Sequence, residues 1–187
     1  MVAKNGGISN TRRITLLALL VAVALIVSLI ESAFPSIIPL APGAKLGLSN
    51  VSPLIALIVL GVPDAFCVML VKCFLGALVS GGLSGLMYSL PAGIASLIVE
   101  IMLFEFVFGK MSVAGISLVG AVVFNCMQLV MAGVITGVSL AALLPWLMLA
   151  GVLAGAFVGL LTYLLIKKLP YSVYGIRKNE GKDVQIQ

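Results

Sequence analysis

The chain has 187 residues, of which 62% are hydrophobic and 9% charged, and its formal net charge is +5. A soluble domain averages about 45–50% apolar and about 25% charged residues, so this composition excludes a soluble protein and indicates an integral membrane protein. The chain has no histidine, which is the commonest acid/base group and metal ligand near neutral pH, and this argues against a catalytic or metal centre.

Residues 1–13 are polar and predict a cytoplasmic N-terminal segment, residues 14–168 predict a transmembrane domain, and the polar residues 169–187 predict a cytoplasmic tail. A helix needs about 20 apolar residues to cross the hydrocarbon core of a bilayer. We therefore expect an all-α membrane protein with six transmembrane helices. The predicted spans are 14–30, 51–60, 65–79, 83–108, 112–135 and 141–166.

One long interruption, rich in proline and glycine, separates the first two spans at 31–50. Long irregular segments in compact domains are usually functional. We interpret this segment, which contains Lys45, as an extracytoplasmic lid over a binding site. A plain connector is the alternative interpretation.

The basic residues predict the orientation of the bundle, because cytoplasmic loops carry an excess of lysine and arginine. Lys45 stands alone on the opposite side, and Lys72 lies within a span. The N and C termini are therefore predicted to be cytoplasmic in a multi-pass protein of the cell (cytoplasmic) membrane. The charge needs no nucleic-acid partner to explain it. The basic residues on the terminal side are Lys4, Arg12, Arg13, Lys110, Lys167, Lys168, Arg177, Lys178 and Lys182.

Lys72 is the strongest candidate for a binding residue, since a lysine at the centre of a membrane helix costs about 2.5 to 3.5 kcal/mol on insertion scales. Its ammonium could meet an anionic or carbonyl group of a ligand. An internal ion pair with Glu100 on the fourth span is the alternative. Helical rise places Glu100 closer to the cytoplasm than Lys72, which weakens that pair.

Five more polar residues converge on the outer half of the membrane from different segments. A site loaded from outside needs such a setting, with apolar walls and a few oriented donors and acceptors. The alternative is that they only form hydrogen bonds between helices. These candidate substrate-binding residues are Asn50, Tyr88, Ser89, Asn125 and Gln128.

Small residues at i, i+4 spacing allow helices to approach closely. Ala18 and Ala22 form such a series on the first span, and Gly151, Gly155 and Gly159 form one on the sixth. Either face could pack within the bundle or dock a partner.

Two catalytic motifs are absent from the sequence. No G-x-x-x-x-G-K-[ST] phosphate-binding loop is present, so the chain cannot use ATP through one. The two aspartates, Asp64 and Asp183, lie far apart and form no aspartate-rich pair for magnesium and a diphosphate. We therefore expect a protein that is not an enzyme, without a metal site or a covalently bound cofactor.

Several short motifs together resemble the Gx transporter family, over roughly residues 14–166. They are PGAKLGLSN at 42–50, LGAL at 75–78 with GG at 81–82, MYSL at 87–90, and Asn125 with Gln128. This family is also labelled heptaprenyl diphosphate synthase component I. It groups with the substrate-binding S components of energy-coupling factor (ECF) importers. Phe124 and Met127 stand where the family commonly has histidine and glycine, which bears on the substrate.

The resemblance implies a six-helix S-component-like bundle with an outward pocket under the loop after the first helix. It implies that Ala18 and Ala22 dock on a transmembrane coupling protein driven by two ATPase subunits. The cargo would be a small vitamin-like solute, with a flavin as the first candidate for the transported ligand. The alternative is a non-catalytic membrane subunit associated with a heptaprenyl diphosphate synthase.

Overall fold

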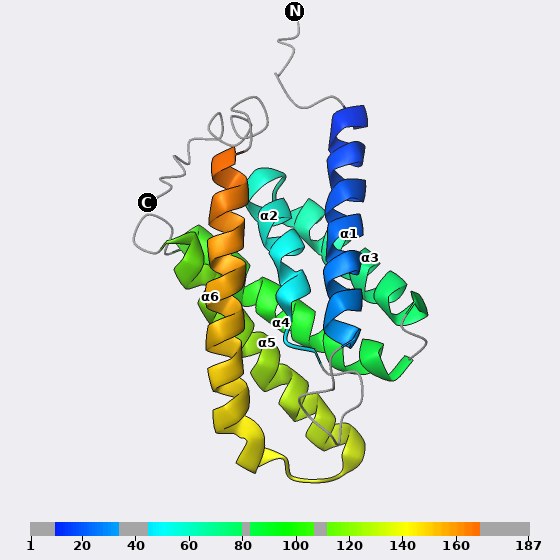
Figure 1. Ribbon diagram of the computed structural model, residues 1–187, viewed down its shortest axis with the longest axis vertical. Helices are drawn as coiled ribbons and strands as arrows, with labels where there is room; N and C mark the ends of the chain where they lie inside the picture. The colour runs from blue at the N-terminus through cyan, green and yellow to red at the C-terminus, as the bar shows by residue number, and fades with distance from the viewer. Residues whose placement is uncertain (1–9, 34–44, 80–82, 107–111, 169–187) are drawn as a thin grey trace, which may run out of the picture.

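The computed structural model describes residues 10–33, 45–79, 83–106 and 112–168, and in these ranges every regular element is a helix. Figure 1 shows the bundle that they form. In chain order the elements are α1 (Asn10–Ala33), η1 (Leu48–Asn50), α2 (Val51–Val59), α3 (Val62–Val79), α4 (Leu83–Phe106), α5 (Val113–Thr136), η2 (Ala141–Leu143) and α6 (Leu144–Lys168).

Five of these helices, α1, α3, α4, α5 and α6, are long and apolar enough to cross a membrane. The predicted all-α membrane bundle is confirmed at this level. The second predicted span differs, because α2 has only nine residues and rises about 14 Å, against about 30 Å of hydrocarbon. Within the described residues, five long helices and one short helix thus stand where six spans were predicted.

The short helix α2 forms the centre of the bundle. All nine of its residues are buried, and it packs against α1, α3, α4 and α6. Its Leu54 and Leu57 join a core with Met69 of α3, Phe104 of α4 and Ile116 of α5. Because other helices shield α2 on every side, it needs no polar face, and this explains its continuous apolar sequence.

The helix ends follow local sequence signals. Ser112 precedes α5 and its hydroxyl accepts a hydrogen bond from the Gly115 amide at 3.2 Å, as an N-cap residue does. Pro91 lies inside the continuous helix α4. Most of the predicted lid, at 34–44, lies outside the described residues, as do Lys110 and the terminal segments 1–9 and 169–187.

The two ends of the bundle carry different polar groups. The first residue of α1 and the last residue of α6 lie at the same end in Figure 1. At that end the Arg13 guanidinium forms an ion pair with the Asp64 carboxylate, with an N–O distance of 2.6 Å, and the exposed Lys167 lies over the Tyr163 ring. At the opposite end of α1, Ser28 accepts a hydrogen bond from Lys45, and Glu31 accepts one from the Leu48 amide.

The glycines of α6 pack against α5. A Cβ atom added at Gly155 would lie 2.7 Å from the Leu118 Cα, and one added at Gly159 would lie 2.6 Å from the Ala114 Cα. The Ser117 hydroxyl also donates to the Gly155 carbonyl at 3.0 Å. Of the two interpretations of this small-residue series, packing within the bundle is therefore the correct one.

We expect Gly159→Ala to destabilise the protein by about 1–3 kcal/mol, because the new methyl group meets the backbone of α5, which cannot rotate away. Gly133→Ala is the matched control, since its Cβ would lie 3.4 Å from the nearest atom, the Val138 carbonyl oxygen. Thermal unfolding in detergent micelles measures both. Equal midpoints for the two variants would contradict the packing described here.

Candidate functional site

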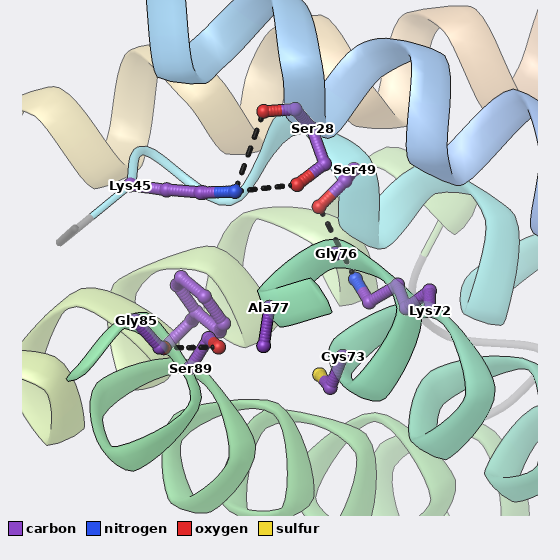
Figure 2. A pocket seen from close by; sticks show the side chains of 10 residues that line it. Ser28, Lys45, Ser49, Lys72, Cys73, Gly76, Ala77, Gly85 and Ser89 are labelled. Atoms are coloured by element: carbon purple, nitrogen blue, oxygen red, sulfur yellow. Dashed lines mark hydrogen bonds between the residues drawn. The ribbon is translucent and has the colours of Figure 1, made fainter. Parts of the chain in front are cut away.

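A cavity lies between the end of α1, the segment that precedes η1, and the facing parts of α3 and α4. Figure 2 shows that polar side chains from these separate elements point into it. The lining residues are Ser28, Lys45, Ser49, Lys72, Cys73, Gly76, Ala77, Gly85, Ser89 and Phe124.

Lys72 on α3 is 6% exposed and points toward the start of α2. Its ammonium donates hydrogen bonds to the Ser49 hydroxyl at 3.3 Å and to the Asn50 side-chain oxygen. Both acceptors are neutral. The predicted alternative was an ion pair with Glu100. In the described part of the chain, no carboxylate lies within ion-pair distance of Lys72.

Glu100 occupies a different environment, between α4 and α5. It is 3% exposed, and the Ser96 hydroxyl lies 3.5 Å from its Oε1 while donating to the Gly120 carbonyl at 2.9 Å. A Cβ atom at Gly120 would collide with the Glu100 carboxyl group, so this glycine makes room for it. Glu100 does not line the cavity.

Lys45 lies across the cavity from Lys72. Its ammonium donates to the Ser28 hydroxyl at 2.6 Å and to the Ser28 carbonyl at 3.4 Å, and its backbone amide donates to Gln128 Oε1 at 3.2 Å. Burial lowers the pKa of the Lys45 ammonium, and the charge of the Glu31 carboxylate acts in the opposite direction. Lys45 therefore ties the segment before η1 to both α1 and α5.

Glu31 is a site residue that the sequence analysis missed. Its two carboxylate oxygens accept hydrogen bonds from the backbone amides of Leu48 at 2.9 Å and Ser49 at 3.4 Å. It thereby satisfies free amides at the start of η1 and holds Ser49, one of the two residues that contact Lys72. The sequence signal that could have identified Glu31 is its i, i+3 spacing from Ser28, which places both residues on one face of the helix.

The predicted site residues divide into three groups. Lys45, Lys72 and Ser89 line the cavity, and Asn50 and Gln128 are hydrogen-bonded to the two lysines.

Tyr88 and Asn125 lie elsewhere. Tyr88 packs in a separate apolar cluster with Leu129 and Leu147, and Asn125 donates to the Ala121 carbonyl of its own helix and faces Gly151 of α6.

Gln128 has a further property. It is 1% exposed, and its Oε1 accepts from the Lys45 amide, whereas its Nε2 has no hydrogen-bond partner among the residues that the structure describes. A buried amide donor without a partner costs about 1–3 kcal/mol. Gln128 thus has a free donor for a polar group of a ligand that displaces its present neighbours.

The cavity is small, about 30 Å³, which is room for only one or two water molecules. Sites for small organic ligands enclose about 300–1,000 Å³. The arrangement seen here can therefore hold a single polar group of a solute, and a whole vitamin requires the lining elements to separate.

The outer face of α1 is a second candidate surface. Ala18 and Ala22 are exposed on it, and α1 is the least buried of the five long helices. Small exposed residues one turn apart leave space for the backbone of another helix.

A comparison with protein-family models matches residues 20–165 to the family described as heptaprenyl diphosphate synthase component I. The chain belongs to this family. It is the Gx transporter family, an ECF S-component-like family, so the resemblance inferred from the motifs is confirmed. The match to heptaprenyl diphosphate synthase component I includes every residue that lines the cavity. No curated protein and no solved structure matches the chain.

Proposed function

We propose that this protein is the substrate-binding S component of an ECF-type importer, without catalytic activity of its own. In this proposal it captures a small vitamin-like solute from outside the cell membrane. A transmembrane coupling protein and two ATPase subunits supply the work. The observation that carries the proposal is the cavity, in which the buried Lys72, the half-buried Lys45 and several neutral polar groups meet inside an otherwise apolar bundle.

The position of the cavity supports capture from outside. Ser28, which binds Lys45, lies near the end of α1, whereas Arg13 lies near its start. In Figure 1 the start of α1 and the end of α6, which carries the exposed Lys167, lie at the same end of the bundle. If the basic end is cytoplasmic, as the positive-inside rule predicts, then the cavity is on the outer side.

A flavin is our first candidate for the solute, and the purified protein provides a direct check, because a bound flavin is yellow and fluorescent. A flavin needs far more room than about 30 Å³. The candidate therefore also requires that α1 and the segment before η1 move away from α3 and α4 on loading.

Affinity purification of the tagged full chain from its native membranes tests the proposed function. We expect a transmembrane coupling protein and ATPase subunits to copurify, together with a small solute that denaturation releases. If neither the coupling protein with its ATPase subunits nor a solute copurifies, the proposal is contradicted.

The second candidate function is a non-catalytic membrane subunit of a heptaprenyl diphosphate synthase. The description of the family as heptaprenyl diphosphate synthase component I favours it. It predicts that a soluble prenyl diphosphate synthase copurifies in place of the ATPases, so the same purification separates the two functions.

A further inference from the structure

The two cavity lysines keep unused hydrogen-bonding capacity. An ammonium group has three N–H donors. Within the described residues, Lys45 Nζ has two acceptor atoms, both of Ser28, and Lys72 Nζ has two, from Ser49 and Asn50. One N–H of each lysine is left, and both ammonium groups border the same cavity (Figure 2).

The cavity also has an unbalanced charge. Glu31 is the nearby carboxylate, but its two oxygens already accept the Leu48 and Ser49 amides. No ion pair joins Glu31 to either lysine in the part of the chain that the structure describes. Glu100, whose charge also acts on Lys72, lies between α4 and α5 and does not line the cavity. The two ammonium groups and the Glu31 carboxylate therefore leave a formal charge of +1 next to the cavity, and all four acceptor atoms on the lysines are neutral.

Buried ammonium groups are costly unless an opposite charge pairs with them. Hydrogen bonds between an ammonium and a carboxylate or phosphate oxygen are also about twice as strong as those between neutral groups. An anion between the two lysines would therefore supply both the missing charge and the missing acceptors.

We propose that the transported solute carries an anionic group with at least two acceptor oxygens, a carboxylate or a phosphate, and that this group binds between Lys45 and Lys72. The inference rests on the proposed function only in assigning the solute to this cavity. The anion takes the remaining N–H of each lysine and competes with the Ser28, Ser49 and Asn50 oxygens. A cavity of about 30 Å³ takes one or two oxygens of the charged group, while the rest of the solute extends beyond it.

Solutes that lack the charged group should bind more weakly. Losing charge-assisted hydrogen bonds to buried donors lowers affinity by at least about tenfold. The neutral member of a pair that differs only in a phosphate or a carboxylate is therefore the poorer ligand.

The test uses the full chain in lipid nanodiscs, with inorganic phosphate and acetate as probes and chloride at matched ionic strength as the reference. Thermal midpoints are compared for the native chain, Lys72→Met, Lys72→Arg and Lys167→Met. Lys167 is exposed at the opposite end of the bundle, so its variant removes the same charge without altering the cavity.

We expect phosphate or acetate to raise the midpoint of the native chain, Lys72→Arg and Lys167→Met above its value in chloride, and to leave Lys72→Met unchanged. The probe with the larger effect identifies a phosphate or a carboxylate as the group. An equal response of Lys72→Met and the native chain, or no response of the native chain beyond that to chloride, would overturn the proposal.

The outcome also separates this inference from the proposed function. If the anion response is absent while the coupling protein copurifies, then the anion site is wrong and the transport role remains. If the anion response is present while no coupling protein copurifies, then the transport role is wrong and the anion site remains.

Discussion

Replacing Ala18 and Ala22 together by tryptophan should reduce copurification of the proposed coupling protein by at least about tenfold and leave the proposed anion binding in the cavity unchanged. Both alanines are exposed on α1, and neither lines the cavity. Overpacking a helix interface costs about 1–3 kcal/mol, and each 1.4 kcal/mol changes an equilibrium tenfold.

The matched control is the double variant Leu153→Trp and Phe157→Trp on α6. These residues have the same i, i+4 spacing and are 66% and 56% exposed, so the control adds bulk to another apolar face. We expect it to keep the coupling protein. Equal retention by both double variants would exclude α1 as the docking helix.

Replacing Gly47 by alanine should destabilise the protein by about 2–5 kcal/mol and disturb the cavity. Gly47 has a φ of 84°, in the left-handed region, where a residue with a side chain costs about 1–2 kcal/mol. Its added Cβ would also lie 2.8 Å from the Phe124 ring, and this overpacking costs about 1–3 kcal/mol more.

Gly137→Ala provides the control for this variant. Gly137 also has a positive φ, 68°, but a Cβ added there has no atom within 4 Å. It should therefore lose only about 1–2 kcal/mol. Differential scanning calorimetry measures the unfolding of both variants. The double variant Gly47→Ala with Phe124→Leu then isolates the contact between the added Cβ and the Phe124 ring. If Phe124→Leu does not restore any of the stability that Gly47→Ala loses, the proposed clash with the ring is contradicted.

The fold class was predictable because apolar runs of membrane length dominate the sequence. The bounds of α2 were also predicted within one residue, but its burial at the centre of the bundle was not. A helix that is buried on all sides has the same continuous apolar sequence as one surrounded by lipid. Sequence periodicity cannot separate them, and only the packing of α1, α3, α4 and α6 around α2 does so.

The site was predictable where a residue was chemically out of place in a membrane. Lys72 stood out for its cost in hydrocarbon, and Lys45 for its position in the irregular segment. Asn125 and Gln128 could not be told apart from the sequence, because both are amides on the same helix. In the structure Gln128 contacts Lys45, whereas Asn125 contacts its own helix. Glu31 and Ser28 were missed because their roles depend on how the segment before η1 folds back onto α1.

Native mass spectrometry of the full chain purified from its own membranes tests the central claim most directly. The account predicts a bound small anionic solute on the native chain and on Lys167→Met, and its loss from Lys72→Met. A native chain that carries no solute, or a solute that Lys72→Met retains to the same extent, would contradict it.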